Sequence, residues 1–419
     1  MAVAVFHVGQ TTYLYQGSGN LELLIHPQIE TNPVSIALSW AYAVLFCGGT
    51  VPPMVLFFFV LSGFVLTSSL MKEVSPTIKT GVAFFGGRIF RILPAVIFTV
   101  SVFCLIYFSL NLRLYAPEVY TVPNIIRSFI LFDVRIDGVM WSLQVEWFGT
   151  FAIFFAYLIA IYGGRSTVLV LCSILAALSL FDAVIHFATF GGRISRVAYL
   201  HTFIFGAIAY HFGATWWAGA NKWVQGVALA TAVVVFFLAM PIAAGTFQPE
   251  FGSSSSLGII LQALCAAVAI SIMAFGDLRL TMLDWRITRF YGKISYSFYL
   301  LHPVALTVIW AHRDPTSTMP YVLWKIVEFG VPAPLLAIAL AVISVVAVTP
   351  LAYLCWRYVE TTGIRLGSRF RASLRTSGAV PRQGHGAQPG AIDAVIEMPA
   401  LPTAGRPMLG TSEGGRPSA

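Results

Sequence analysis

Charged residues are scarce in this sequence, and their scarcity excludes a water-soluble globular protein. Only 10% of the 419 residues are Asp, Glu, Lys or Arg, whereas 58% are hydrophobic. Soluble domains carry about 25% charged and about 45–50% apolar residues. A chain with so few charges cannot cover itself with polar surface, so most of its surface must face lipid. The sequence therefore predicts an integral membrane protein whose main partner is the lipid bilayer.

Cysteine is also rare, and its placement argues against a disulfide framework or a cysteine metal site. The five cysteines lie far apart within apolar stretches and show no CxxC spacing. We interpret them as small core hydrophobes, and we predict no metal site. The net charge of +8 does not indicate a nucleic-acid partner, because the basic residues lie between apolar segments rather than in one patch.

Long apolar runs are abundant, and each is long enough to cross a hydrocarbon core of about 30 Å as a helix. The clear runs are 54–71, 92–110, 141–162, 167–189, 198–215, 223–243, 257–275, 294–311 and 331–356. Residues 1–9 form only a stub of a further helix. The pattern predicts an all-α fold, a polytopic membrane helix bundle of about ten transmembrane helices with a truncated first helix.

The distribution of Lys and Arg between the loops predicts the orientation of the bundle. The basic residues on one side outnumber those on the other, which favours both termini in the cytoplasm of a multi-pass inner-membrane protein. From Gly363 the composition turns to Gly, Pro, Ser and Arg without periodicity. We therefore predict a membrane domain over residues 1–362 and a disordered cytoplasmic tail over 363–419 with a basic start beside the membrane.

Four ionisable residues inside or beside the apolar runs are candidates for function, because such groups cost roughly 2.5–3.5 kcal/mol at the membrane centre. Glu146 is either an interfacial residue that reaches water or a functional carboxylate. His302 is either a neutral core imidazole or part of a site. Arg88 and Arg91 share a helix face, where they either anchor the helix at the cytoplasmic boundary or bind phosphate groups.

Ser62 and Gly63 interrupt an aromatic run of the first clear span. Small residues allow two membrane helices to approach closely, so we predict a packing role for this pair. The sequence shows neither a general base nor an oxyanion hole beside Ser62, so we do not interpret it as a nucleophile.

Several segments, taken in order, resemble one family, the integral-membrane acyltransferase family three, whose members O-acylate polysaccharides, O-antigen, peptidoglycan and macrolides. Each segment alone is a weak pattern, but their order and spacing over about residues 1–360 make the resemblance specific. The matching segments are residues 4–7, 58–64, 88–94, 141–146, 292–302 and 356–360.

The resemblance implies a role for each matching residue. His7 corresponds to an essential first-helix histidine, the expected general base for the acceptor hydroxyl. Glu146 is expected to orient that histidine or to bind the acceptor. Arg88 and Arg91 are expected on the cytoplasmic side, where the phosphates of acyl-CoA would lie, with His7 and Glu146 toward the outer half.

The remaining matching residues form a second tier of candidates. His302 belongs to this tier without a defined role. Arg357 and Glu360 belong to the family's closing segment, where an ion pair at the cytoplasmic end of the last helix is expected.

The implied activity is the acyl-CoA-dependent transfer of an acyl group, acetyl in the first instance, to a hydroxyl of an exported glycan or lipid-linked saccharide. Acetyl-CoA acts as a co-substrate, and no permanently bound cofactor is expected. The alternative is a multi-pass transporter of a small molecule or glycan precursor, because charged residues also line transport paths. A transporter should show inverted repeats and broken helices in matching halves, and we find neither in the sequence.

The sequence departs from the family pattern at its first helix. The family has a basic residue about ten positions before the histidine, whereas only six residues precede His7 here. Two explanations of this short first helix remain. The true start codon lies upstream and would restore the full helix, or the first span is damaged.

Overall fold

The computed structural model describes six stretches of the chain and two isolated positions. The described residues are 33, 37, 53–73, 76–112, 117–185, 196–246, 256–309 and 333–376. His7 and the predicted first-helix stub lie outside them. The chain divides into a unit Met1–Ser377 and a unit Gly378–Ala419, and everything described below belongs to the first.

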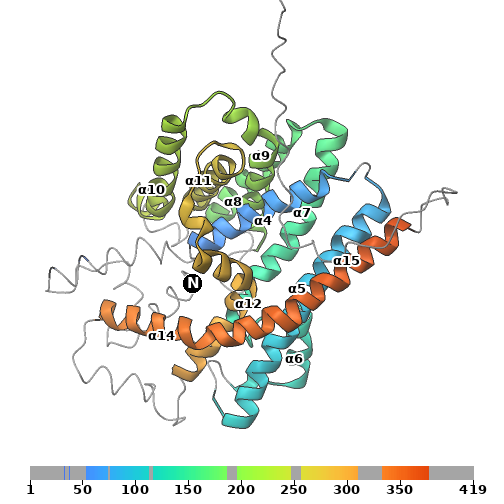
Figure 1. Cartoon of the computed structure of the whole chain (residues 1–419), viewed down its shortest axis with the longest axis vertical. Helices are drawn as coiled ribbons and strands as arrows, with labels where there is room; N and C mark the ends of the chain where they lie inside the picture. Colours follow the sequence, from blue (N-terminus) through green and yellow to red (C-terminus); the bar gives the residue numbers. More distant parts are fainter. Residues whose placement is uncertain are drawn as a thin grey trace, which may run out of the picture. The chain divides into compact units, whose positions relative to one another are not determined.

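Within the described residues, the apolar runs predicted as membrane spans lie mainly in helices, so the all-α bundle is confirmed. The helices are α4 (Pro53–Leu70), α5 (Ile78–Leu110), α6 (Val122–Phe129), α7 (Trp141–Gly163), α8 (Thr167–Ile185), α9 (Leu200–Trp216), α10 (Lys222–Thr246), α11 (Ser256–Phe275), α12 (Arg286–Ile309), α14 (Ala333–Leu354) and α15 (Thr361–Thr376). Figure 1 shows α4 beside α9 and α11, with α10 against α11, α8 against α9, and α5 and α15 side by side.

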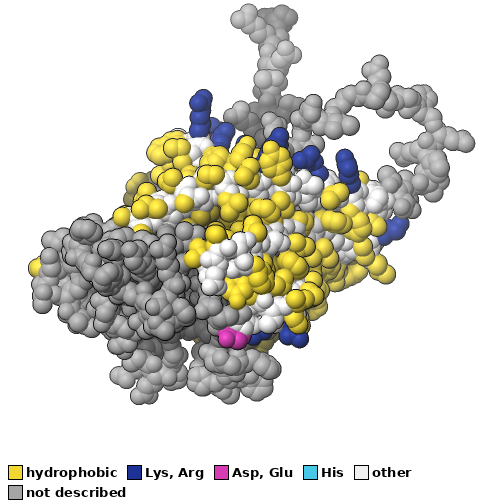
Figure 2. All heavy atoms as spheres, turned by 90° about the horizontal axis from the view of Figure 1, so that it is seen from below, with side chains coloured by type: hydrophobic (Ala, Val, Ile, Leu, Met, Phe, Trp, Pro, Cys, Tyr) yellow, Lys and Arg dark blue, Asp and Glu magenta, His cyan; other side chains and the backbone are white. Residues whose placement is uncertain are grey.

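Six of the helices in the described part are long and apolar enough to cross a membrane. They are Pro53–Leu70, Ile78–Leu110, Gly138–Gly163, Lys222–Ala239, Ser256–Phe275 and Ile338–Leu374. A helix satisfies its own backbone hydrogen bonds, which is why apolar segments in lipid take this form. Figure 2 shows the result on one face, where hydrophobic side chains cover a broad area and Lys and Arg gather at its margins.

Helices α4 and α9 cross at a point where both backbones lack side chains. A Cβ on Gly63 would overlap the carbonyl of Phe203, and a Cβ on Gly206 would overlap the carbonyl of Val60. Beside this crossing the rings of Phe59 and Phe203 stack at 5.0 Å between centroids. The packing role predicted for the Ser62–Gly63 pair is confirmed, because only glycine permits so close an approach.

The cysteines in the described part behave as predicted. Cys172, Cys265 and Cys355 are buried, Cys104 is half-buried, and all four are free thiols. They pack as small apolar side chains among the helices.

The tail differs from the prediction in its first residues. We predicted disorder from Gly363, but α15 continues as a helix to Thr376 and packs along α5. A Cβ on Gly363 would overlap the carbonyl of Phe90, so this contact is again made by a glycine. The polar composition was misleading, because α15 obtains its stability from packing on α5 rather than from an apolar run of its own.

Candidate active site

Arg88 and Glu146 form an ion pair inside the bundle. Arg88 lies in α5 and is 7% exposed, and Glu146 lies in the second turn of α7 and is 4% exposed. Glu146 Oε1 accepts a hydrogen bond from Arg88 Nη2 and another from the Ser62 hydroxyl at 3.4 Å. Removing either charge from water alone costs several kcal/mol, so each group depends on the other for its place in the interior.

This pairing differs from the arrangement expected from the sequence. We placed Arg88 at the cytoplasmic boundary and Glu146 toward the opposite half, but the structure puts the two side chains in direct contact. Arg91, three residues further along α5, is exposed. Residues three apart on a helix are offset by about 60°, which allows Arg88 to point inward while Arg91 remains accessible. The two arginines therefore do not form a matched clamp on one open face.

Glu360 is a second buried carboxylate. It is 4% exposed and accepts a hydrogen bond of 2.8 Å from the Ser297 hydroxyl of α12. It ends a π-helical turn, Cys355–Glu360, that joins α14 to α15. The predicted ion pair between Arg357 and Glu360 is wrong for the described part of the chain, because Arg357 is exposed while Glu360 points inward. The π turn, with its i→i+5 hydrogen bonds, changes the angular offset that an α-helix would give these two residues.

Tyr296 lies among all of these charges. Its hydroxyl donates a hydrogen bond of 3.1 Å to the carbonyl of Ile92 on α5. The ring lies within electrostatic reach of a set of residues that we name the charge cluster: Arg88, Arg91, Glu146 and Glu360. The cluster thus contains two guanidinium groups and two carboxyl groups.

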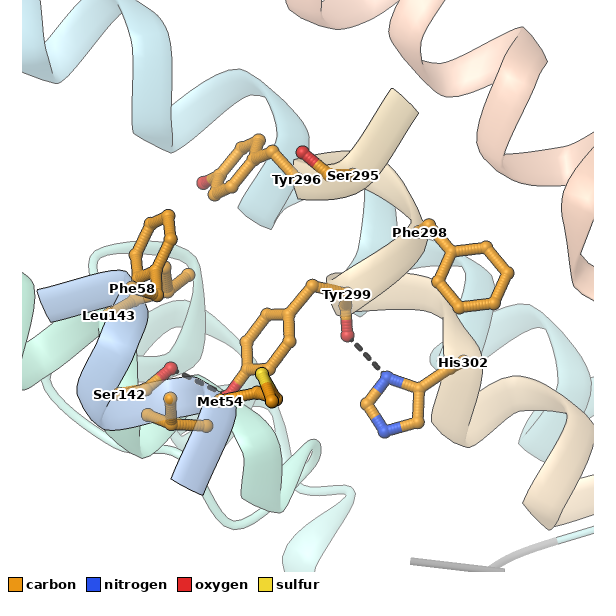
Figure 3. Close-up of a pocket in the computed structure, with 10 residues that line it drawn as sticks. Met54, Phe58, Ser142, Leu143, Ser295, Tyr296, Phe298, Tyr299 and His302 are labelled. Carbon is orange, nitrogen blue, oxygen red and sulfur yellow. Dashed lines mark hydrogen bonds between the residues drawn. The ribbon is translucent and has the colours of Figure 1, made fainter. Parts of the chain in front are cut away.

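A cavity of about 130 Å³ opens between α4, α7 and α12 (Figure 3). It is large enough for a few water molecules or a small organic group. Its lining is Met54, Val55, Phe58, Ser142, Leu143, Ser295, Tyr296, Phe298, Tyr299 and His302. Tyr296 connects the cavity to the charge cluster, and Ser142 lies four residues before Glu146 on the same face of α7.

Hydroxyl groups concentrate on one wall of the cavity. Ser142 Oγ and Tyr299 Oη lie 2.7 Å apart, and the Tyr299 hydroxyl donates to the carbonyl of Val139 at 2.9 Å. We did not assign a role to Ser142 or Tyr299 from the sequence. Their spacing from Glu146 and His302, one helical turn in each case, was the available signal.

His302 contributes an imidazole to the same cavity. It is 2% exposed, and its Nδ1 lies 2.6 Å from the carbonyl oxygen of Tyr299. A carbonyl oxygen only accepts, so Nδ1 carries a proton. His302 is thus buried and forms part of the cavity wall, and its contact to Tyr299 lies within its own helix.

The loop between α6 and α7 holds the cavity wall in place through Asp137. This residue is 1% exposed, and its carboxylate accepts a hydrogen bond of 3.3 Å from the Val139 amide. Burial raises the pKa of Asp137 well above its ordinary value, and the Val139 hydrogen bond opposes this only in part. Asp137 thereby caps the short turn whose Val139 carbonyl receives the Tyr299 hydroxyl.

The same loop has an ion pair closer to solvent. Arg135 donates to Asp133 Oδ2 at 2.6 Å and to Asn124 Oδ1 of α6 at 3.0 Å. Partial burial acts to raise the pKa of Asp133, but the hydrogen bonds and charge of Arg135 outweigh it and lower this pKa below its usual value. In the part of the chain that the structure describes, no three His, Cys, Asp or Glu side chains come together as metal ligands would.

A family model described as an acyltransferase domain, acyltransferase family 3, matches residues 1–357. The chain belongs to this family. The match spans most of the chain and identifies a multi-pass membrane acyltransferase. No curated protein and no solved structure matches the chain.

Membership in acyltransferase family 3 gives the buried groups a chemical context. The matched range includes the Arg88–Glu146 pair and every residue that lines the cavity. Glu360 and α15 lie beyond its end. The cavity beside these buried charges presents an imidazole and hydroxyls, which are groups able to exchange protons with a bound substrate.

Proposed function

We propose that the chain transfers an acyl group, acetyl in the first instance, from acyl-CoA to a hydroxyl of an exported glycan or lipid-linked saccharide. The observation that supports this most directly is the buried Arg88–Glu146 pair beside a cavity of acetyl-group size. Buried charges at membrane depth are costly and mark functional sites. In an acyltransferase they lie where acyl donor and acceptor would meet.

The proposed reaction is a direct acyl transfer. His7 takes the proton of the acceptor hydroxyl, whose oxygen attacks the thioester carbonyl of the donor. The carbon–sulfur bond then breaks, and the CoA thiolate leaves and takes up the proton. His7 lies outside the described residues, so its assignment rests on the sequence.

Glu146 fits the accompanying role of orienting the base or binding the acceptor. Its Oε1 is occupied by Arg88 and Ser62, while Oε2 is buried with no hydrogen-bond partner among the described residues. A carboxylate held on one oxygen keeps the other available to an N–H or O–H donor. We assign Arg88 to holding the Glu146 side chain in position, which leaves Arg91 as the member of the pair accessible to the donor.

In the proposed topology both termini lie in the cytoplasm, so the donor enters from the side where acyl-CoA is made. The acceptor is reached from the opposite side. His302 is a second imidazole at the cavity, and we propose that it contacts the acceptor or the transferred group rather than replacing His7.

The test uses purified protein in nanodiscs with radiolabelled acetyl-CoA and lipid-linked saccharides from the source membranes. We expect CoA thiol release that depends on acceptor, loss of it in His7→Ala and Glu146→Gln, and near-normal activity in the control His211→Ala on α9. Full activity in His7→Ala would refute the base assignment. Transport of a saccharide without any use of acyl-CoA would refute the proposed function.

A further inference from the structure

A second and larger hollow lies away from the charge cluster. It has a volume of about 470 Å³ and opens between the end of α4, the start of α5 and α15. We call it the basic cleft, lined by Ser69, Leu70, Lys72, Glu73, Thr80, Ala83, Phe84, Ser368, Arg371 and Ala372. Its lining combines hydroxyls with charged side chains, unlike the largely apolar wall of the small cavity.

The charges around the basic cleft favour an anion. Lys72 and Arg371 line it and are exposed, against the single carboxylate of Glu73. Thr80 and Ala83 bring the first turns of α5 into the wall, and the N-terminal end of a 33-residue helix carries partial positive charge. Three more exposed cations lie on the flanking segments: Lys79, Arg365 and Arg369. An arginine fork, an ammonium group and hydroxyls are the groups that bind phosphate oxygens in proteins.

The arginine pair of α5 is a weaker candidate for the same anion. Arg88 is buried and already paired with Glu146, and the carboxyl group of Glu360 interacts electrostatically with Arg91. A phosphate could displace Glu146 only by leaving a buried carboxylate unpaired, which is strongly unfavourable. Among the described residues, the uncompensated positive charge therefore lies at the basic cleft rather than at the arginine pair of α5.

Helix α5 connects the two hollows. Thr80 lines the basic cleft, and Ile92 accepts the hydrogen bond from Tyr296 at the small cavity. At 1.5 Å per residue the separation along the helix axis is about 12 Å from Thr80 to Arg88 and about 18 Å from Thr80 to Ile92. A donor that spans both hollows must carry its phosphates on a long extended arm away from its reactive carbonyl.

We propose that the basic cleft binds the phosphate-bearing nucleotide end of the acyl donor through Lys72 and Arg371, while the donor's arm runs along α5 toward the small cavity. This inference rests on the proposed function, because it takes acyl-CoA as the donor. It moves the phosphate anchor from the arginine pair to residues of the α4–α5 connection and of α15. It also assigns α15 to the donor-binding site, although the family match ends before this helix.

The test measures ligand binding to the purified full chain in nanodiscs of phosphatidylcholine. The probes are CoA, which carries three phosphates, and pantetheine, which carries none. We expect the double variant Lys72→Ala/Arg371→Ala to weaken CoA binding by at least about tenfold, since each lost charge-assisted contact is worth about that factor. Pantetheine binding should stay within about twofold of wild type.

Two control variants separate specific contacts from general electrostatics. Lys222→Ala/Arg286→Ala removes the same two charge types from exposed positions that neither line nor flank the cleft. Lys72→Arg/Arg371→Lys keeps both charges in place. Both controls should bind CoA within about threefold of wild type.

The outcomes distinguish the failure of each proposal. Acceptor-dependent acyl transfer by a Lys72→Ala/Arg371→Ala protein with unchanged affinity for CoA would overturn the cleft assignment and leave the proposed function intact. Equal weakening by the Lys222→Ala/Arg286→Ala control would also overturn it. Loss of CoA binding when phosphatidylglycerol is added to the nanodiscs would identify the cleft as a lipid headgroup site instead. Absence of CoA binding to wild type would refute both proposals.

Discussion

The buried Arg88–Glu146 pair should couple the two residues strongly in stability as well as in activity. Removing one member of a buried ion pair leaves an uncompensated charge and costs about 3–5 kcal/mol. With an effective dielectric constant of about 20, two unit charges about 4 Å apart attract by about 4 kcal/mol, which agrees with that range. We expect Arg88→Met and Glu146→Gln each to lower the free energy of unfolding by about 3 kcal/mol or more.

The double variant is the informative one. Arg88→Met/Glu146→Gln removes both charges at once, so its cost should be well below the sum of the single costs, with a coupling energy of about 3 kcal/mol. The assay is thermal unfolding in nanodiscs, where about 1 °C of melting temperature corresponds to each kcal/mol for a chain of this size. Each single variant should therefore melt about 3 °C below wild type or lower.

A matched pair at the surface provides the control for this cycle. Arg289 and Asp284 form an ion pair at 2.7 Å, but their side chains are 64% and 73% exposed. The variants Arg289→Met and Asp284→Asn should show a coupling energy below about 1 kcal/mol, because water screens exposed pairs. If the Arg88 and Glu146 costs add within about 0.5 kcal/mol, the two groups do not stabilise each other and the reasoning is refuted.

Three further changes test other contacts. Gly206→Ala should lower the melting temperature by several degrees, because the added methyl group overlaps the α4 backbone, and differential scanning fluorimetry would measure it. Ser297→Ala should cost about 1–3 kcal/mol in the same assay, because Glu360 loses its hydrogen bond inside the bundle. Asp133→Asn should remove a contribution of below about 1 kcal/mol to the free energy of unfolding. Wild type has this contribution above about pH 4 and loses it as the pH falls through the lowered pKa of Asp133.

Each of these has a simple counter-outcome. Gly226→Ala meets only open space and one distant methyl group, so equal losses at Gly226 and Gly206 would contradict the packing argument. Ser295 bonds only within its own helix, and an equal cost for Ser295→Ala would show that the Ser297 effect is not due to Glu360. The melting temperature of wild type should fall more between pH 6 and pH 3 than that of Asp133→Asn. Equal falls would exclude the Asp133 contribution.

The helices could be predicted because their cause is local. An apolar run near 20 residues long in lipid has no stable alternative to a helix, so composition and length alone located the spans. The candidate residues followed from the same argument, since Glu146 and Arg88 stood out as charges beside apolar runs. Their contact could not be predicted, because they are 58 positions apart in sequence and meet only through the packing of α5 on α7.

The direction of Glu360 and the helical start of the tail could not be predicted, because both depend on geometry that composition does not determine. The inward direction of Glu360 follows from a π turn, and no sequence pattern we applied distinguishes that turn from an α-helix. The helical start of the tail follows from glycine contacts with α5, where a polar composition alone indicated disorder. In both cases a contact between distant segments overrode the local preference of the chain.

The π turn at Cys355–Glu360 sets the rotational phase of the whole C-terminal helix. If the same residues formed a regular α-helix instead, the one extra residue would rotate α15 by about 100° about its axis relative to α14. The Gly363 face would then turn away from α5, and Arg371 would leave the basic cleft together with it. The extra residue of the π turn is therefore what allows Glu360 to point into the bundle while Arg371, about three turns further along, lines the basic cleft.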